Sequence, residues 1–330
     1  MILVSSPTSS SRSEFDLIKR YFTGLGNNQF VKLGVGDDAA ITSIPAGYEL
    51  VTTVDTLVAD VHFFADTAPE LIGYKSLAVN LSDLAAMSAT PVWFTLSLAV
   101  PEIDESWLQA FSRGLTDLAL QYSVALVGGD TVRGPLTITI QACGIVEQGK
   151  ALLRDGAKVG DGIYITGPLG DARLALELLK GDRTIDKTYL TACCDKLHKP
   201  VARIKEGLLL KEFANAAIDI SDGLVADLSH VLQRSDVGAR IFLDDLPVSD
   251  AMRKSVSESE SQNRSLYGGD DYELCFTVPT DKQDAMLSKM KANDCVVYRI
   301  GTIAREKGLF GVHTDGDASL LEQRGYDHFS

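Results

Sequence analysis

The chain has 330 residues, of which 45% are hydrophobic and 23% charged, so it is long enough for about two globular domains with buried cores. Its net charge of −14 argues against a basic surface for duplex nucleic acid or anionic lipid. A protein of this charge that handles phosphates needs local basic residues or bound cations, because its overall field repels anions.

Strand-like and helix-like patterns alternate in the first half of the chain. Apolar and β-branched runs identify strands, and apolar residues at helical spacing identify helices. The predicted strands span residues 48–54, 92–100, 124–127 and 136–146, and the predicted helices span 71–87 and 105–122. The third strand is expected to end at Gly128-Gly129. This alternation predicts an α/β (α+β) fold of layered sheets and helices.

A segment rich in Gly, Lys and Asp at 147–162 interrupts this rhythm. It predicts an N-terminal domain (14–148) and a C-terminal domain (149–330), preceded by a flexible, Ser-rich lead-in (1–13). The predicted strands of the second half span 163–166, 216–220, 272–278 and 296–300, and its helices span 171–179, 189–197, 201–213, a segment starting at Ser221, and 281–292. The polar segment 249–265 is predicted to be a solvated helix and loop.

Several features predict the cellular compartment. The five cysteines form no C-x-x-C pair, and an odd number without a framework is typical of reduced thiols in a cytoplasmic protein. No apolar run approaches the roughly 20 residues of a membrane helix. The N-terminus lacks a basic region ahead of an apolar core, as a secretory signal would have. We therefore expect a cytoplasmic protein with neither membrane nor nucleic acid as a partner.

Aspartates beside glycines, or at the ends of apolar strands, stand out from the other acidic residues. They fall in six segments: 34–38 (GVGDD), 52–55 (TTVD), 80–83 (NLSD), 128–131 (GGDT), 219–223 (DISDG) and 268–273 (GGDDYE). In α/β sheets, ligands bind at the carboxyl ends of strands, and glycines allow a ligand close to the backbone. The pattern predicts a binding site to which both halves of the chain contribute.

The residue types in these segments indicate the ligand. Many Asp with Thr and Ser, and almost no His or Cys, are hard oxygen donors that suit Mg²⁺ better than zinc or copper. Carboxylates that converge without cations repel one another strongly. Mg²⁺ is usually held by one or two carboxylates together with substrate phosphates. The residue types therefore favour a site in which several Mg²⁺ ions bind together with a nucleotide.

Local sequence leaves structural alternatives open for several of these residues. Asp83 has the position of a carboxylate on a helix surface. Ser221 is a good N-cap and Asp222 suits the first turn of a helix, so capping and metal binding are equally favoured. Asp38 fits a simple turn equally well. Asp219 interrupts an apolar strand and has no such local explanation.

Other familiar motifs are excluded. Residues 144–151 match the start of a P-loop, but Ala151 stands where Ser or Thr would bind Mg²⁺, and an apolar run follows instead of a helix. The histidines form no ligand-like pair. No G-x-S-x-G or Cys–His arrangement suggests a covalent nucleophile, and no general base is evident, so neither is predicted.

Taken together, these segments resemble the thiamine-monophosphate kinases of the PurM-like superfamily. The resemblance runs from about residue 14 to 329 and rests on eight motifs in order: SEFDLI–RYF, LGVGDDAA, DTLVADVHF, YKSLAVNLSDLAAM, GGDTVRGP, AIDISDGLVADL, GGDDYELCFTVP and GYDHF. It implies a homodimer whose N-terminal domains join their β-sheets, with nucleotide in a cleft toward the C-terminal domain. It also implies transfer of the γ-phosphoryl group of ATP to thiamine phosphate, with Mg²⁺, as the final step of thiamine diphosphate biosynthesis.

The resemblance also implies roles for particular residues. The metal ligands of the family fall on Asp38, Thr53, Asp55, Asp83, Asp130, Asp219 and Asp222. Its nucleotide contacts fall on Gly129, Asp130, Arg154 and Ser221, and its substrate contacts fall on His62 and Asp270. Val54, Asp270 and Gln323 depart from the family pattern, which usually has a hydroxyl residue, a Glu and an aromatic residue there.

The implied reaction is a direct in-line displacement without a phosphoenzyme. A phosphate oxygen of thiamine phosphate is the nucleophile, and its second pKa of ~6 makes it largely dianionic at neutral pH, so no strong base is needed. Mg²⁺ would neutralise the two polyanions, helped by Arg154, Lys75 or Arg133. Three alternatives remain: another ATP-using enzyme of the superfamily, of the aminoimidazole-ribotide synthetase type; a metal-dependent phosphatase; and a non-enzymatic divalent-cation-binding protein.

Overall fold

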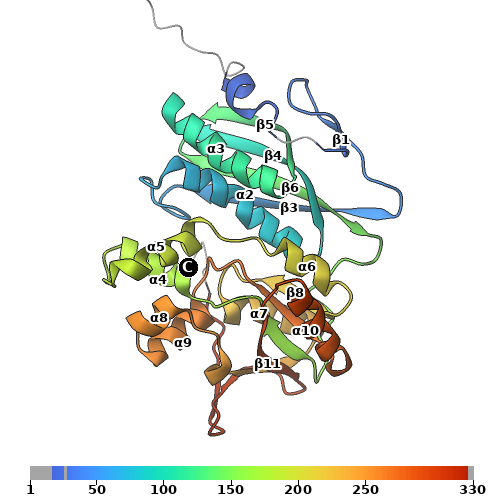
Figure 1. Cartoon of the computed structure of the whole chain (residues 1–330), viewed down its shortest axis with the longest axis vertical. Coiled ribbons are helices and arrows are strands. Elements are labelled where there is room, and N and C mark those ends of the chain that lie inside the picture. Colours follow the sequence, from blue (N-terminus) through green and yellow to red (C-terminus); the bar gives the residue numbers. More distant parts are fainter. Residues whose placement is uncertain (1–16, 26–27, 326–330) are drawn as a thin grey trace, which may run out of the picture.

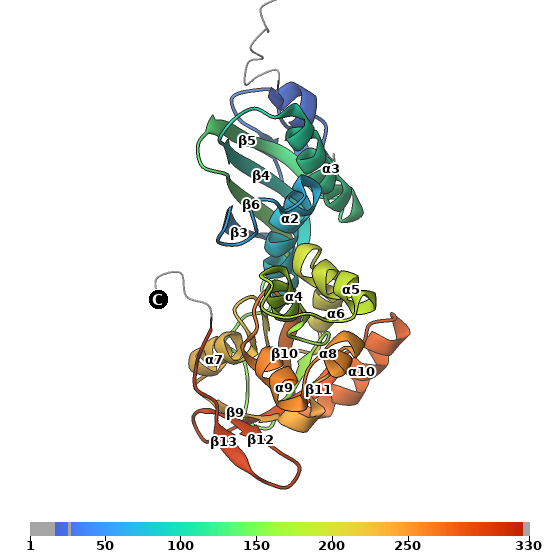
Figure 2. The same ribbon diagram turned by 90° about the vertical axis from the view of Figure 1, so that its left-hand side faces the viewer.

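Each half of the chain is built around a large β-sheet in the computed structural model, which describes residues 17–25 and 28–325 (Figures 1 and 2). A four-stranded sheet with two helices on one face organises the N-terminal half, and a seven-stranded sheet flanked by helices organises the C-terminal half. The predicted α/β (α+β) fold is confirmed. The predicted lead-in at 1–13 and all but the first residue of the motif at 325–329 lie outside the described residues.

The N-terminal sheet has the strand order β3-β6-β4-β5, with β4 and β5 parallel and the other neighbours antiparallel. The elements of this half are η1 (Ile18–Phe22), β1 (Val31–Leu33), β2 (Ile41–Thr42), β3 (Tyr48–Val58), α2 (Pro69–Ala86), β4 (Thr90–Val100), α3 (Glu105–Gln121), β5 (Ala125–Arg133) and β6 (Thr137–Glu147). Strand β3 continues beyond its predicted end at residue 54, because it pairs with β6 over its whole length.

The two faces of this sheet carry different side chains, since successive residues of a strand point to opposite faces. Helices α2 and α3 cover one face of this sheet (Figure 2). On that face, Asp55 shares a row with the buried Ile140 and Leu96. The next row, on the opposite face, consists of Thr56, Thr139, Ser97 and Asp130. Asp55 and Asp130 therefore lie on opposite faces and on the two outermost strands.

The predicted end of the third strand at Gly128-Gly129 is wrong, because β5 continues beside β4 as far as Arg133. A Cβ at Gly129 would lie 1.8 Å from the carbonyl oxygen of Leu96, so only a glycine lets the two strands approach this closely. Asp130 is consequently a residue of the strand itself.

The C-terminal sheet has the order β13-β12-β9-β11-β7-β10-β8. Its strands are β7 (Gly162–Ile165), β8 (Ala216–Asp219), β9 (Gly238–Phe242), β10 (Leu274–Val278), β11 (Tyr298–Ala304), β12 (Leu309–Val312) and β13 (Ala318–Leu320). The helices are α4 (Asp171–Leu179), α5 (Lys187–His198), α6 (Ile204–Leu210), α7 (Leu224–Ser235), η2 (Leu243–Asp245), α8 (Asp250–Ser255), α9 (Glu258–Tyr267), η3 (Thr280–Lys282) and α10 (Gln283–Ala292).

Helix α2 is buried on nearly every side because it lies between the two large sheets. It contacts β3 and β6 on one side and β8 and β10 on the other. Leu77 and Leu81 of α2 share one hydrophobic core with Phe276 of β10. The other face of the C-terminal sheet packs on α7 in a separate core that includes Ile218 and Leu228. Polar side chains that α2 directs toward the C-terminal half are therefore held in place by packing on both sides.

Other elements differ from their predicted bounds. The polar segment 249–265 forms two short helices, and α9 begins with reciprocal hydrogen bonds between Ser257 and Glu260. Helix α6 is shorter than the predicted 201–213, and α7 starts at Leu224 instead of Ser221. Strands β9, β12 and β13 complete one end of the sheet and are not among the predicted elements. Across residues 17–25 and 28–325, no helix is long and apolar enough to cross a membrane.

Candidate active site

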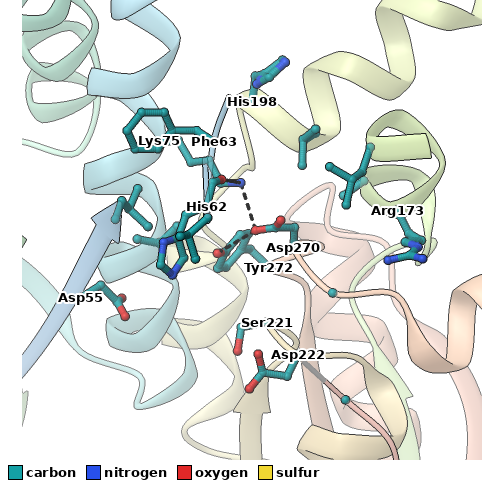
Figure 3. A pocket seen from close by; sticks show the side chains of 18 of the residues that line it. Asp55, His62, Phe63, Lys75, Arg173, His198, Ser221, Asp222, Asp270 and Tyr272 are labelled. Carbon is teal, nitrogen blue, oxygen red and sulfur yellow. Dashed lines mark hydrogen bonds and ion pairs between the residues drawn. The ribbon is translucent and has the colours of Figure 1, made fainter. Parts of the chain in front are cut away.

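Two cavities between the halves of the chain share a wall of two carboxylates. The larger, of about 1030 Å³, is lined by His62, Lys75 and Asp270 among others (Figure 3). The smaller, of about 560 Å³, is lined by residues of β3 and α7 and by Arg154. Asp83 and Asp219 line both cavities. The arrangement has room for two ligands, one on each side of this carboxylate pair.

Five of the seven predicted metal ligands meet at this wall from both halves of the chain. They are Thr53 and Asp55 of β3, Asp83 of α2, Asp219 at the end of β8, and Asp222 in the loop that follows. The Thr53 hydroxyl donates to Asp83, and the Ser82 hydroxyl donates to Asp219 at 2.7 Å. The local alternative for Asp83, a carboxylate on a solvated helix surface, is wrong because α2 lies between the sheets.

Burial and mutual repulsion make these carboxylates hard to ionise. Burial, followed by the charges of Asp83 and Asp222, raises the pKa of Asp55 to about 6. Burial also raises the pKa of Asp83, although the Thr53 hydroxyl and the Arg154 guanidinium oppose that shift. Asp219 is 5% exposed, and burial together with Asp83 raises its pKa well above the usual value. A cation at this wall would relieve the repulsion.

The stability of the metal-free protein is expected to fall as the pH rises from about 5.5 to 8. The folded pKa values of Asp55 and Asp227, about 6 and about 7, exceed the 3.8 of an unperturbed carboxyl. The folded state therefore holds protons that the unfolded state has lost, and raising the pH removes this stabilisation. Melting temperatures measured in a chelator across this range check the sign. Adding Mg²⁺ should raise the melting temperature more at pH 8 than at pH 5.5, and an equal rise would contradict the prediction.

The donor set at the wall fits Mg²⁺. Carboxylate and hydroxyl oxygens are the hard ligands that this ion prefers. Within the described residues, no three His, Cys, Asp or Glu side chains converge closely enough to form a complete metal cage. Mg²⁺ does not require one, because it usually takes one or two carboxylates and completes its octahedron with waters and substrate phosphates.

Two glycine-containing loops pack against each other at the edge of the larger cavity. The carbonyl oxygen of Ser221 accepts a hydrogen bond from the Asp270 N–H at 2.8 Å. A Cβ at Gly269 would lie 2.5 Å from this same carbonyl oxygen, so a side chain there would separate the loops. The capping alternative for Ser221 is wrong, because Gly223 precedes α7 and the Asp227 carboxylate binds the N–H groups of residues 221–223. The side chains of Ser221 and Asp222 line the cavity instead.

The predicted substrate residues lie near one another in the larger cavity (Figure 3). Asp270 accepts a hydrogen bond from the Tyr272 hydroxyl at 3.1 Å and pairs with the Lys75 ammonium at 3.0 Å. Asp270 and Tyr272 both have left-handed backbones, with φ of 67° and 50°, a strained conformation that is common in binding loops. His62 accepts a hydrogen bond at Nδ1 from the Val58 N–H at 3.0 Å, which leaves the ring proton on Nε2.

Lys75, a predicted helper for the phosphates, lines the larger cavity and pairs with Asp270. Its side chain is only 3% exposed, and its ion pair with Asp270 joins α2 to a loop of the C-terminal half. The sequence contains a signal for this position, because Lys75, Val79 and Asp83 are spaced four residues apart and share one helix face that lines the cavity. Tyr272 and Asp227 carry no comparable signal, since their roles depend on loops that meet only in the folded chain.

Two predicted metal ligands lie elsewhere in the chain. Asp130 is on the outer face of β5, about 14 Å from β3 at the usual spacing of ~4.8 Å between strands. Asp38 lies in the loop between β1 and β2, and its backbone N–H donates to Asp37 at 2.8 Å. The β1 strand contacts β5, and neither Asp38 nor Asp130 lines the two cavities. Gly129 and Arg133 do not line the two cavities either. Gly129 lies beside Asp130 in β5, and Arg133 donates to the carbonyl oxygen of Pro101.

The departure at Val54 is explained by the pleat of β3. The Val54 side chain is 61% exposed and points to the outer face, away from the carboxylate wall that Thr53 and Asp55 approach. A hydroxyl at this position would not reach the wall from within the same chain.

Comparisons with known proteins agree over nearly the whole chain. Residues 36–146 match the family model described as "AIR synthase related protein, N-terminal domain", and residues 158–314 match the corresponding C-terminal domain. The thiamine-monophosphate kinase of Escherichia coli K12 is 45% identical over 324 residues, covering 96% of this chain and 98% of that protein.

Solved structures give the same result. The thiamine-monophosphate kinase of Stenotrophomonas maltophilia K279a superposes with a TM-score of 0.85 at 44% identity, covering 93% of this chain and 98% of that one. A structure described as AaThiL complexed with AMPPCP and TMP superposes with a TM-score of 0.77 at 31% identity, covering 96% of each chain.

Proposed function

Because the chain belongs to the thiamine-monophosphate kinase family, whose members are phosphotransferases with a phosphate group as acceptor, we propose that it transfers the γ-phosphoryl group of ATP directly to thiamine monophosphate. The product is thiamine diphosphate, and Mg²⁺ is the required cation. The structural neighbour bound to AMPPCP and TMP supports this pair of substrates.

The observation that carries this proposal is the carboxylate pair shared by the two cavities. A reaction that joins two polyanions needs two binding spaces that meet at one place, with cations at the junction. Asp83 and Asp219 stand at that junction, and Arg154 adds a positive charge on the side of the smaller cavity. We therefore assign ATP to the smaller cavity and thiamine monophosphate to the larger one.

The residues at the junction suit an in-line transfer. Mg²⁺ ions, each held by one or two of Asp55, Asp83 and Asp219, would supply charge neutralisation between the reactants. The acceptor phosphate is already largely dianionic at neutral pH, so the chain needs only to orient it and exclude competing water. Arg154 in the smaller cavity and Ser221 in the larger one are the proposed contacts to the nucleotide, and Ser221 would meet only phosphates that extend past the carboxylate pair. No aspartyl phosphate should form on the enzyme.

Asp270 is proposed to recognise the cationic part of the substrate. The thiazolium ring of thiamine carries a positive charge, which a partly buried carboxylate attracts. Removing that carboxylate would also leave the buried Lys75 ammonium unpaired beside a cationic ligand, which adds repulsion to the lost attraction.

Asp270→Asn is therefore expected to raise the KM for thiamine monophosphate at least about tenfold, which corresponds to roughly 1.4 kcal/mol. The KM for ATP should change less than about twofold, because the carboxylate lies away from the smaller cavity. Steady-state kinetics with each substrate varied in turn measure both values. Asp60→Asn removes the same charge from another part of the larger cavity and serves as the control. An equal rise in KM for both substrates would contradict this role for Asp270.

A homodimer accounts for the two distant ligands. Asp130 lies on the outer face of β5, and neither Asp38 nor Asp130 lines the two cavities that meet at the carboxylate wall. The outer face carries exposed Val54 and Val132 beside Thr and Ser side chains, a surface suited to a second sheet. We propose that two copies pair through these sheets, so that Asp38 and Asp130 of one copy complete the site of the other.

A product assay separates the proposed function from its alternatives. Incubation with ATP, thiamine monophosphate and Mg²⁺ should give ADP and thiamine diphosphate in equal amounts, and a chelator should abolish both. Release of phosphate from thiamine monophosphate without ATP would identify a phosphatase. Mg²⁺ binding that is independent of nucleotide, with no product, would identify a cation-binding protein. ATP turnover with another phosphate acceptor alone would indicate a different enzyme of the superfamily.

A further inference from the structure

One buried carboxylate next to the site has no part in the reaction proposed above. Asp227 lies in the first turn of α7 and is only 4% exposed. One of its oxygens, Oδ2, accepts hydrogen bonds from the backbone N–H groups of Ser221, Asp222 and Gly223 at 3.0, 3.0 and 3.1 Å. These three consecutive donors are the last three of the four residues between β8 and α7.

Three successive N–H groups ahead of a helix are an arrangement that in many proteins binds a phosphate. Here the chain fills that position with its own carboxylate. The phosphates of a nucleotide therefore have no access to these backbone donors. The loop can contribute to the site only through the side chains of Ser221 and Asp222, both of which line the larger cavity.

The loop is held from its other side as well. The carbonyl oxygen of Ser221 accepts the Asp270 N–H at 2.8 Å, and the carbonyl oxygen of Ile220 accepts the Tyr272 N–H at 2.8 Å. The N–H groups are thus fixed by Asp227 and the carbonyl groups by the loop around Gly269. A single side chain, Asp227, thus binds all three N–H groups.

The charge of Asp227 argues against a purely structural role. It lies near Asp219 and Asp222, where another carboxylate adds repulsion to an already crowded site. Elsewhere the chain caps helices with a neutral side chain, Ser249 at α8, or with exposed carboxylates, Asp104 at α3 and Asp186 at α5. Asp227 differs from these carboxylates because it is buried. A carboxylate is the side chain whose single oxygen best accepts three N–H bonds at once, because its charge strengthens each bond.

We propose that Asp227 is a positioning residue that fixes the backbone of residues 221–223 and so directs Ser221 and Asp222 toward nucleotide and Mg²⁺. This inference rests on the proposed kinase function. It assigns Asp227 no contact with substrate, metal or reacting atoms, and its effect passes through the loop.

The test compares Asp227→Ala and Asp227→Asn with wild type by amide hydrogen exchange and by calorimetric titration with AMPPCP and Mg²⁺. The alanine variant should exchange the N–H groups of residues 221–223 at least about 100-fold faster, because their acceptor is lost. Its affinity for AMPPCP with Mg²⁺ should fall at least about tenfold, and kcat should fall with it. Binding of thiamine monophosphate alone should weaken less than binding of AMPPCP, because Ser221 and Asp222 also line its cavity but Asp270 remains to hold its cationic part. The asparagine variant keeps an acceptor oxygen and should recover most of the nucleotide affinity.

Asp161→Ala is the matched control. Asp161 is also buried, and its Oδ2 accepts the Lys158 N–H at 3.0 Å and the Asn215 side-chain amide at 2.8 Å, away from both cavities. The Asp161→Ala substitution should lower the melting temperature without changing the affinity for AMPPCP. If Asp227→Ala does not fold, Asp227→Glu takes its place, since its longer side chain displaces the accepting oxygen. Asp227→Glu should then exchange the N–H groups of residues 221–223 faster than wild type and bind AMPPCP more weakly.

A folded variant with fast exchange at 221–223 and wild-type nucleotide affinity would overturn the proposal. Unchanged exchange would overturn it as well, because the loop would then be fixed by other groups. Hydrogen exchange and calorimetric titration do not depend on turnover. A wild-type protein that makes no thiamine diphosphate would therefore count against the proposed function, while these two measurements would still decide the role of Asp227.

Discussion

Asp219→Asn is expected to reduce turnover by at least about 10³-fold and to raise the melting temperature of the metal-free protein. Removing a preorganised charge at the reacting centre costs about 10²–10³-fold in rate, and here the carboxylate also borders both reactant cavities. The stabilisation has a separate cause. Asp219 is buried, and its ionised form is disfavoured first by burial and then by Asp83.

Asparagine has nearly the shape of the aspartic acid side chain and carries no charge. Its oxygen can accept the hydrogen bond that Ser82 now donates to Asp219 at 2.7 Å. Relief of about 1 kcal/mol corresponds to a rise of roughly 1–2 °C in a chain of 330 residues. Thermal denaturation in a chelator, followed by circular dichroism, measures the shift. A lower melting temperature, or turnover above a tenth of wild type, would contradict the assignment of Asp219 to a functional charge cluster.

Mixing two inactive variants, Asp83→Asn and Asp130→Asn, is expected to restore about a quarter of wild-type activity. If each site combines Asp83 of one copy with Asp130 of the other, every mixed dimer contains one intact site and one doubly altered site. Random pairing places about half of the chains in mixed dimers, each with half of the normal number of sites. Activity is measured after the two variants are unfolded and refolded together.

The control mixture is Asp83→Asn with Asp219→Asn. These two residues line the same cavities of one chain, so every site of a mixed dimer would carry one of the two changes. No recovery is expected in that mixture. Recovery in both mixtures, or in neither, would exclude sharing of the site between two copies. High activity of Asp130→Asn alone would remove Asp130 from the site altogether.

The parts of the fold that follow local rules were predictable from the sequence. Helices α2, α3 and α4 lie within two residues of their predicted bounds, because each has apolar spacing and a clear start or stop. Strand β5 was not predictable in its second half, since the glycines that normally end a strand here allow close pairing with β4. Strands β9, β12 and β13 are short and lie at one end of the sheet, where the apolar pattern is weak.

The candidate site divides in the same way. Asp219 could be predicted because a charge at the end of an apolar strand needs an explanation outside that strand. Asp83 could not be separated from a surface carboxylate by helical spacing, since only the second sheet shows that its side of α2 is covered. The start of α7 was predicted three residues early for a related reason. Asp227 binds the N–H groups that Ser221 was expected to cap, and this requires the folded loop.

The position of α2 has a consequence for how the chain comes apart. Family models divide the sequence into two domains, yet the helix of the first contributes to an apolar interior that β10 of the second completes. Cutting the chain between the two domains would expose the apolar side chains that α2 and β10 bury against each other. Neither fragment is therefore expected to keep its native structure alone. The polypeptide should therefore melt as one cooperative unit, with a single calorimetric transition in place of two.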